Sequence, residues 1–507
     1  MNVVHKLEET TVDADVVISG AGPTGLLLGA ELALAGLRVR ILERQEARHG
    51  QSRALTLHPR SIEILELRGI ADRFLAAGHT VPGWHFAGLS RKLDFSVLDT
   101  RHGYTLFLEQ ARTERLLEDR ARELGVEISY GHEVVSLTQT GDGVDVVGVG
   151  PDGGFSLRAA YLVGCDGGRS MVRESAGIGF PGSDSTMSTM LGDFAVSDKE
   201  EIAAAGQVPV LIAPMTGGVT RFVVTSPGRM RIPPSEPVTF EEFREALVEL
   251  TGTSFGIAEP QWLSRFGNAT RLAETYRAGR VFLAGDAAHI HFPAGGQGLN
   301  TGLQDAMNLG WKLAAEIKGW APPGLLDTYH AERFPMGELV ADNTQAQALL
   351  LELTLVPDYR RPVIALRGLL ESLLDLPEVN ARLAGLVSAL ATSYPAPDDD
   401  PLVGTRMPDL PLGSSGTGVS KLVHSGLFGY VDFTGDGAAQ VAEGWKDRIA
   451  VATGGDRAWA EDVGEVLVRP DGHIAWVRRE NDLPDAASRE AGLTAWAGTP
   501  DRTAVRR

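Results

Sequence analysis

The sequence predicts an α/β fold in which a Rossmann-like βαβ domain is interrupted by a mostly antiparallel β-sheet, continues as a helical segment and is followed by a separate α/β module. Three observations support this prediction. A glycine-rich turn joins a strand to a helix at 15–34, short alternating strands begin near residue 180, and an apolar strand at 281–284 leads into a second glycine-rich loop. The predicted parts are 1–180 and 281–395 of one domain, the inserted sheet 181–280, and the C-terminal module 402–507.

The composition, with 43% hydrophobic and 22% charged residues, is that of a globular protein. A net charge of −19 disfavours a nucleic-acid partner, because phosphates would be repelled. Cys165 is the only cysteine, which excludes an intrachain disulfide. The first residues lack the apolar core of a signal peptide, and no stretch approaches the roughly 20 apolar residues of a membrane span. We therefore expect a soluble cytoplasmic protein without a nucleic-acid or membrane partner.

The first unit of the chain is a complete strand–helix–strand motif. Asp15–Ser19 is a β-branched run, residues 26–34 repeat apolar side chains at helical spacing, and Arg38–Leu42 is predicted to be the second strand. A glycine-rich turn between the first strand and the helix, in this context, is typical of dinucleotide binding.

The glycines of that turn, GAGPTG, have separate roles in such a motif. Gly20 permits the tight turn, Gly22 lets a pyrophosphate approach the backbone, and Gly25 lets the helix and strand pack closely. Glu43 ends the second strand, where a carboxylate can bind the hydroxyls of an adenosine ribose.

Two polar residues follow for which the residues alone leave alternatives open. Arg53, in a loop before a helix, could reach the cofactor or substrate, or could pair at the surface with Glu43 or Glu46. Gln110, near the start of the helical stretch 107–123, could donate to a phosphate or ribityl oxygen, or could be a solvated first-turn residue.

A second strand region spans 134–147, and the buried strand 160–163 then leads into the segment GCDGGRS. Asp166 at the end of this strand, with Arg173 seven residues later on a helix, predicts a turn that faces a phosphate. Cys165 has no basic partner beside it in sequence and is interpreted as a packing residue rather than a nucleophile.

From 180 to 280 the pattern changes to short strands separated by Pro and Gly turns, such as 209–212 and 220–224. We interpret this insertion as a sheet that covers one face of the cofactor and serves as a substrate platform. Phe266 and Asn268 close it before the chain returns to the strand at 281.

That returning strand is followed by the stretch GDAAHIHFPAGGQGLNTGLQD. Asp286 stands at the strand's end, where ligands of open α/β sheets collect. The residues Pro293, Gly295, Gly296 and Gly298 would let backbone approach something flat and bulky, and a helix is predicted from Gly302. We interpret His289 and His291 as packing residues and expect no metal site.

The chain is predicted to be helical to about residue 390, with a linker of composition PAPDDDP at 395–401. Strands follow at 427–433, at 448–453 and in a hairpin over 465–477. This module contains no cysteine, so it cannot carry out dithiol chemistry.

The three motifs GAGPTG with Glu43, CDGGRSMVR, and GDAAHIHFPAGGQGLNTGLQDAMNLGWKL together resemble the single-component flavin-dependent aromatic hydroxylases, typified by para-hydroxybenzoate hydroxylase. The run AAYLVGCDGGRS, the segment SRFGNATR and the C-terminal module are similar to the bacterial aromatic polyketide hydroxylases of the angucycline, anthracycline and tetracycline type. By the same resemblance the C-terminal module is thioredoxin-like without redox cysteines.

The resemblance implies FAD as the cofactor and NADPH or NADH as a transient co-substrate. The residues implied to contact FAD are Gly20, Gly22, Pro23, Thr24, Gly25, Glu43, Arg44, Gln110, Asp166, Asp286, Pro293, Gly295, Gly296, Gly298, Leu299 and Asn300. Arg53 is the one candidate for a charged residue in the active site.

By the same resemblance the protein is a monooxygenase. NAD(P)H reduces FAD, O₂ is captured as a flavin C4a-hydroperoxide, and a phenolic ring of an aromatic polyketide is hydroxylated in antibiotic biosynthesis. Baeyer–Villiger oxygenation, a flavin oxidase or dehydrogenase, and a non-catalytic flavin-fold scaffold remain alternatives, and both a monomer and a homodimer are compatible with the sequence.

Overall fold

The computed structural model describes residues 12–198, 200, 202, 210–396, 400–413, 417–435, 444–456, 458–482 and 486–501. Its largest sheet has the strand order β18-β19-β11-β1-β2-β8, and β10 and β9 extend it from β11. The strands are β1 Ala14–Ser19, β2 Val39–Glu43, β8 Glu127–Tyr130, β9 Glu133–Gln139, β10 Val144–Gly150, β11 Gly153–Gly164, β18 Arg277–Ala278 and β19 Val281–Leu283. The core pairs β2–β1–β11–β19 are parallel, which confirms the predicted Rossmann-like arrangement.

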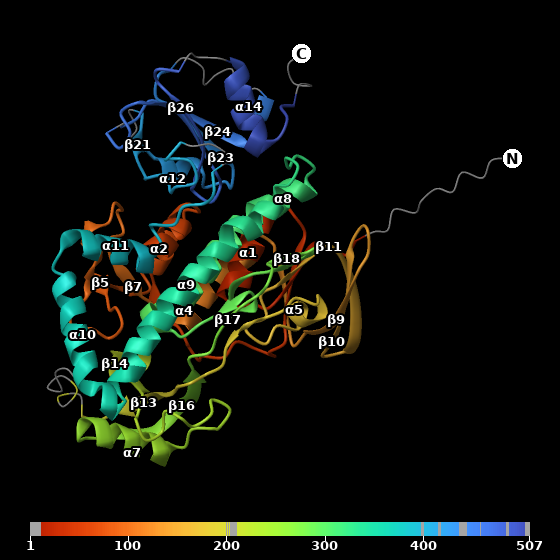
Figure 1. The fold of residues 1–507 in the computed structure, drawn as a ribbon. Coiled ribbons are helices and arrows are strands. Elements are labelled where there is room, and N and C mark those ends of the chain that lie inside the picture. Colours follow the sequence, from red (N-terminus) through yellow and green to blue (C-terminus); the bar gives the residue numbers. More distant parts are fainter. Residues whose placement is uncertain are drawn as a thin grey trace.

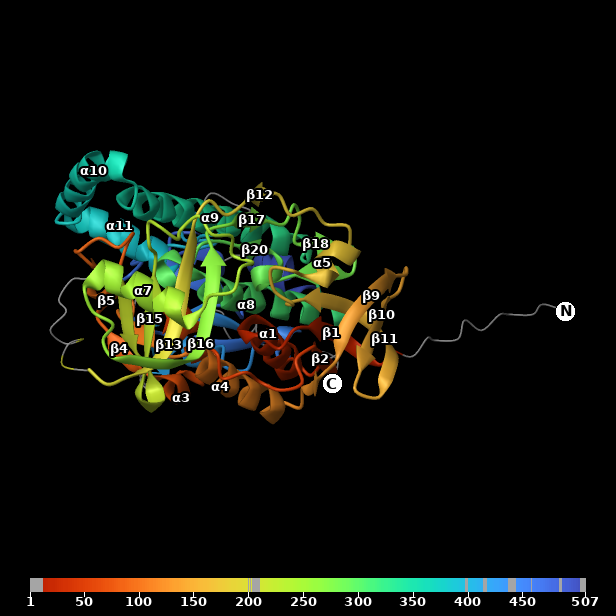
Figure 2. The ribbon, with the colours of Figure 1, turned by 90° about the horizontal axis from the view of Figure 1, so that it is seen from below.

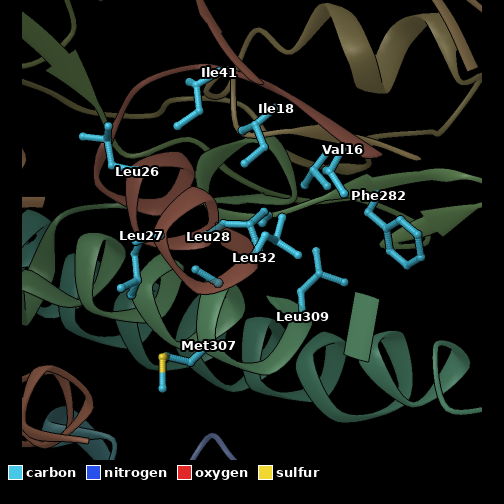
Figure 3. Close-up of a cluster of buried hydrophobic side chains, with 14 of the residues drawn as sticks. Val16, Ile18, Leu26, Leu27, Leu28, Leu32, Ile41, Phe282, Met307 and Leu309 are labelled. Carbon is cyan, nitrogen blue, oxygen red and sulfur yellow. The ribbon is translucent and has the colours of Figure 1, made fainter. Parts of the chain in front are cut away.

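Two helices pack against this sheet, and the hydrophobic core lies between them and the strands. They are α1, Pro23–Leu34, and α8, Gln297–Ile317. Figure 3 shows side chains of both helices, among them Leu28, Leu32 and Leu309, meeting the strand residues Val16 and Ile18 in one apolar layer. Burial of these side chains fixes the position of the two helix N-termini beside the ends of the strands.

The N-terminal part of the chain also forms several short strands and helices. They are β3 Thr56–Leu57, α2 Pro59–Glu66, α3 Ala71–Leu75, β4 His79–Val81, β5 Gly83–Trp84, β6 Leu93–Asp94, β7 Thr105–Phe107, α4 Gln110–Glu123 and α5 Met171–Ser175. The predicted helices after residue 51 and at 107–123 correspond to α2 and α4.

The insertion forms a separate four-stranded antiparallel sheet of order β14-β15-β13-β16. Its strands are β13 Ser188–Val196, β14 Leu211–Pro214, β15 Val219–Val224 and β16 Ile257–Gly267, and small strands β12 Gly182–Ser183, β17 Thr270–Leu272 and β20 His289–Ile290 form a neighbouring sheet. One face packs on helix α7, Phe240–Thr251, which lies in front of the sheet in Figure 2. Helix α7 was not among the predicted elements, and Pro209 of the predicted strand 209–212 lies outside the described residues.

A helical layer follows, made of α9 Asp327–Thr354, α10 Arg360–Leu373 and α11 Pro377–Ser388. Figure 1 shows α8 and α9 crossing the molecule diagonally and the blue C-terminal module at one end of them. That module has a sheet of order β24-β23-β25-β26, with β23 Phe428–Asp432, β24 Ile449–Thr453, β25 Val463–Val468 and β26 Ile474–Arg479, and helices α12 Val419–Leu422 and α14 Ala486–Ala497. The predicted hairpin at 465–477 corresponds to β25 and β26.

One predicted boundary was wrong. Helix α8 begins at Gln297 rather than at Gly302, because the left-handed Gly296 (φ 69°) ends the loop and the chain then turns helical. The Asn300 side-chain amide and the Thr301 hydroxyl donate to the carbonyls of Gly296 and Gln297, four residues before each, and hold this first turn. The division of the chain into four parts stays a prediction, and residues 397–399 of the predicted linker lie outside the described residues.

No helix within the described residues is both long enough and apolar enough to cross a membrane.

Candidate cofactor site and substrate face

The three sequence motifs converge at the carboxyl ends of the parallel strands. A Cβ built on Gly20 would lie 2.3 Å from the carbonyl oxygen of Cys165, and one on Gly25 would lie 2.1 Å from the carbonyl oxygen of Gly20. A Cβ on Gly302 would lie 2.3 Å from Oγ1 of Thr24. The turn at 20–25, the turn after β11 and the start of α8 are therefore in direct contact.

Gly22 differs from the other glycines of its turn. A Cβ built there would meet no atom within 4 Å, and Gly22 caps α1 without a side-chain hydrogen bond. Open space beside a helix N-terminus is the environment that a phosphate group requires. Glu43 accepts hydrogen bonds from the backbone N–H of Ala21 (2.8 Å) and of Gln45 (3.0 Å), so the carboxylate is held beside the turn.

Asp286 is exposed at the end of β19, in a short 3-10 turn that spans Gly285–Ala287. A Cβ on Gly285 would lie 2.7 Å from Oγ1 of Thr24 in α1. Asp286 is therefore the residue next to a close contact between this turn and α1. The carboxylate of Asp305 accepts from the backbone N–H of Gly285 (3.0 Å) and thereby fixes the turn that presents Asp286.

The loop before α8 is held by His58, which was not among the predicted site residues. His58 donates from Nε2 to the carbonyl of Gly295 (2.7 Å), and the His58 backbone N–H donates to Oδ1 of Asn300 (2.8 Å). Burial lowers the pKa of His58 to about 4, so the ring is neutral. Gly295 and Gly296 have φ values of 70° and 69°, which a side chain would oppose. The result is a rigid stretch of backbone that presents no side chain at these two positions.

The segment after β11 contributes a polar group to the same region. Oδ2 of Asp166 accepts from the backbone N–H of Val172 (3.1 Å), whereas Oδ1 is buried and has no hydrogen-bond partner among the described residues. Burial raises the pKa of the Cys165 thiol well above its usual value, which agrees with a packing role. Arg173 is buried and donates to the carbonyls of Ala287 (2.9 Å) and Gly168 (3.0 Å). The guanidinium of Arg173 therefore joins two turns, and the phosphate-facing role of the turn after β11 stays a prediction.

Three further predicted site residues, Gln110, Arg44 and Arg53, lie in or near the loop that precedes α2 or at the start of α4. The Gln110 side chain accepts from the backbone N–H of Ala54 (3.0 Å) and donates to Glu114 (2.8 Å), so its amide holds the loop after residue 51. Arg44 and Arg53 are exposed. Within the described part of the chain Arg53 has no side-chain ion pair, which excludes the pairing with Glu43 or Glu46 there.

The inserted sheet turns one face towards the glycine-rich loop. Asp193 of β13 and Arg221 of β15 lie on that face and form a buried bidentate ion pair (2.8 and 2.7 Å), and Arg221 also donates to the carbonyl of Arg53 (3.3 Å). Phe266 of β16 and Phe292 of the loop have ring centroids 6.2 Å apart. The apolar cluster around this contact consists of Met187, Met230, Phe292, Ala294 and Ala348. These contacts join the inner face of the sheet to the loop, and its role as a substrate platform stays a prediction.

Trp84 adds a polar donor on the other side of the loop. Its indole Nε1 is buried without a hydrogen-bond partner among the described residues and would lie 3.8 Å from a Cβ on Gly296. Sequence analysis missed both Trp84 and His58, since no local pattern distinguishes them from core residues.

Taken together, the residues fit a long anionic cofactor with a flat ring. A helix N-terminus beside Gly22 and a held carboxylate at Glu43 suit the dinucleotide end, and Asp286 with the bare backbone at 295–296 suits the ring end. Within the described residues, no group of three or more His, Cys, Asp or Glu side chains could hold a metal ion.

Comparison with known proteins identifies two matching families. Residues 13–344 match the model of the FAD binding domain, and residues 400–500 match that of the aromatic-ring hydroxylase C-terminal domain. The two matches cover the Rossmann-like domain with its inserted sheet, and the C-terminal module.

Individual relatives agree over nearly the whole chain. The 12-dehydrotetracycline 5-monooxygenase/anhydrotetracycline 6-monooxygenase of Streptomyces rimosus is 45% identical over 96% of this chain and 99% of its own length. A rifampicin monooxygenase of Streptomyces venezuelae is also 45% identical, over 96% of this chain and 98% of its own. Among solved structures, the anhydrotetracycline hydroxylase OxyS from Streptomyces rimosus matches with a TM-score of 0.87 and 44% identity, over 96% of this chain and 100% of that one.

Proposed function

Because this chain belongs to the FAD-dependent aromatic-ring hydroxylases, we propose that it is an NAD(P)H-consuming monooxygenase that hydroxylates a phenolic ring of an aromatic polyketide in antibiotic biosynthesis. The observation that carries the proposal is the convergence of the three motif segments at one site, directly beneath the inner face of the inserted sheet. The tetracycline-modifying relatives support the substrate class.

Each part of the site has a role in this proposal. The N-terminus of α1 at Gly22 binds the pyrophosphate, Glu43 binds the adenosine ribose, and Asp286 binds a ribityl hydroxyl. FAD, when bound, supplies hydride acceptance and oxygen activation. At the start of α8, the backbone N–H groups of Leu299 and Asn300 would hold the ring and would stabilise negative charge on it.

The inserted sheet positions the substrate and excludes water. Its inner face carries aromatic and apolar side chains around the buried, charge-balanced pair of Asp193 and Arg221. An apolar wall of this kind suits a fused aromatic ring. Nε1 of Trp84, which has no hydrogen-bond partner among the described residues, offers one donor for a ring oxygen. The protein acts on small molecules in the cytoplasm, as a monomer or a homodimer.

The decisive experiment measures NADPH and NADH oxidation by the FAD-loaded protein with a panel of tetracyclic and angular aromatic polyketides. Under ¹⁸O₂ a hydroxylase gives a product that is heavier by one labelled oxygen, with its rings intact. Stimulated oxidation that yields only hydrogen peroxide with every compound would contradict the proposal and indicate an oxidase.

A second candidate substrate is an ansamycin such as rifampicin, which the 45% identity to a rifampicin monooxygenase favours. Adding rifampicin to the same panel separates the two substrate classes, because the true substrate accelerates NADPH oxidation.

Baeyer–Villiger chemistry would appear as ring expansion in the product. Purified protein that shows no flavin absorption after FAD is supplied would indicate a non-catalytic scaffold.

A further inference from the structure

The turn of the β25–β26 hairpin in the C-terminal module is buried against the Rossmann-like domain. Arg469 and Asp471 of this turn are 1% and 2% exposed. Asp471 accepts from the indole N–H of Trp311 on α8 (3.2 Å), and its carbonyl accepts from Arg60 on α2 (2.7 Å). The module is therefore docked against the Rossmann-like domain through buried polar groups.

Those polar groups form a charge-balanced cluster. Arg469 donates through both terminal nitrogens to the two oxygens of Glu332 on α9 (2.8 Å each), and Lys312 on α8 donates to Glu332 as well (2.7 Å). Burial would raise the pKa of Glu332, but Arg469 and Lys312 outweigh it and lower the pKa to about 2. Arg469 also donates from Nε to the carboxylate of Asp471 (3.1 Å). Two cations, Arg469 and Lys312, thus neutralise two carboxylates, Glu332 and Asp471.

The residue after Glu332 continues the contacts towards the cofactor site. Arg333 donates to Oδ1 of Asp305 (2.7 Å) and to the hydroxyl of Tyr394 (3.2 Å). The other oxygen of Asp305 accepts from the N–H of Gly285 (3.0 Å) and from Nε2 of His289 (2.8 Å). Asp305 therefore connects α9 to the turn that carries Asp286.

Tyr394 joins the two halves of this network. Its ring lies 4.3 Å from that of His473, in the hairpin, and the guanidinium of Arg469 lies 5.1 Å from its centroid. Its hydroxyl contacts Arg333, and the ring is 4% exposed. Every step from the hairpin to Gly285 is thus a direct contact between buried groups.

We propose that the C-terminal module positions the cofactor-binding turn at Gly285–Asp286 through the buried series Tyr394, Arg333 and Asp305. The hairpin of the module orients Tyr394, which orients the Arg333 guanidinium on Asp305. Tyr394, Arg333 and Asp305 are positioning residues. The proposal rests on FAD binding and is independent of which substrate is hydroxylated.

The test compares two buried tyrosines that each lose one hydroxyl contact to a charged group. Tyr394→Phe keeps the ring against His473 but loses the contact to Arg333, whereas Tyr430→Phe in β23 loses a hydroxyl contact to Glu465 inside the module. We measure the FAD dissociation constant of the apoprotein by flavin fluorescence and the visible circular dichroism of bound FAD. Tyr394→Phe is expected to weaken FAD binding by about three- to tenfold and to alter the dichroism, with no change in Tyr430→Phe.

A second comparison tests whether Tyr394 and Arg333 act through the same series of contacts. In an Arg333→Lys background, Tyr394→Phe is expected to have no additional effect on FAD affinity, because both changes interrupt the same series of contacts. Equal effects of the two tyrosine variants, or independent effects of Tyr394→Phe and Arg333→Lys, would overturn the proposal. Wild-type apoprotein that binds no FAD would instead sink the proposed function.

Discussion

At the scale of single residues, the glycines of the dinucleotide turn separate folding from binding. Gly25 is required because a side chain would collide with the Gly20 carbonyl at 2.1 Å, whereas Gly22 borders open space. The same residue type therefore answers two different requirements, close packing and ligand approach.

This difference predicts opposite outcomes for two matched substitutions. Gly22→Ala should leave apoprotein stability within about 0.5 kcal/mol, since its φ of −72° suits alanine, but should weaken FAD binding at least about tenfold by obstructing the pyrophosphate. Gly25→Ala should destabilise the apoprotein itself, because the new methyl group meets rigid backbone. Urea unfolding of the apoproteins and FAD titration measure the two effects. If Gly22→Ala and Gly25→Ala lost apoprotein stability and FAD affinity in the same proportion, the two glycines would not have separate roles.

Asp286 provides a third prediction at this scale. The side chain is exposed and contributes little to the apoprotein, so Asp286→Ala should leave the unfolding temperature of the apoprotein unchanged. Loss of a hydrogen bond from a ribityl hydroxyl to a carboxylate should weaken FAD binding by about ten- to a hundredfold. Equilibrium dialysis against FAD checks the affinity, and full cofactor occupancy with normal turnover would contradict the assignment of Asp286.

At the scale of elements, the inserted sheet carries a buried ion pair on each face. Asp193 and Arg221 lie on the face towards the cofactor loop, and Glu242 of α7 accepts from Arg265 of β16 on the opposite face (2.7 and 2.8 Å). Both arginine side chains are nearly inaccessible, at 1% and 2% exposure. Breaking either pair leaves a buried guanidinium without its carboxylate, but only the first pair borders the proposed substrate.

We therefore predict that Asp193→Asn and Glu242→Gln have similar stability costs, about 3 kcal/mol each, but different functional effects. Asp193→Asn should raise the substrate KM and the fraction of NADPH diverted to hydrogen peroxide, because Arg221 also holds the backbone at Arg53. Glu242→Gln should change neither quantity. Steady-state kinetics with peroxide detection distinguishes the two, and unaltered coupling in Asp193→Asn would remove the sheet's inner face from the substrate site.

Sequence alone predicted the elements whose signal is local. The β1–α1–β2 unit, the strand before Asp286 and the β25–β26 hairpin have apolar periodicity or turn residues within a short window. The helix α7 was missed because its amphipathic pattern lies inside a region read as strands. Asp305 and His58 were missed as site residues for a different reason: each acts through a partner distant in sequence, Arg333 and Gly295, which no local pattern identifies.

At the scale of the whole molecule, burial of ionisable rings sets how the protein responds to acid. Burial lowers the pKa to about 4 in each of four histidines, namely His58, His85, His291 and His473. These rings come from the Rossmann-like domain, the cofactor loop and the C-terminal hairpin. They are neutral in the folded protein at pH values where the unfolded chain, with an ordinary histidine pKa near 6.5, already binds protons.

This burial predicts a steep loss of stability between pH 6.5 and pH 4. Because the unfolded state binds more protons in that window, the free energy of unfolding falls as the pH falls, by about 3 kcal/mol per histidine once the pH reaches 4. Four such groups together approach the stability of a typical protein, so acid unfolding should begin well above pH 4. His473→Gln should reduce the number of protons taken up on unfolding by about one, so the free energy of unfolding should fall less steeply with pH. His49→Gln, at an exposed position, should leave this slope unchanged. Urea unfolding at pH 7.5, 6.5 and 5.5 measures the slope, and equal slopes in wild type and His473→Gln would show that this ring does not contribute to the acid response.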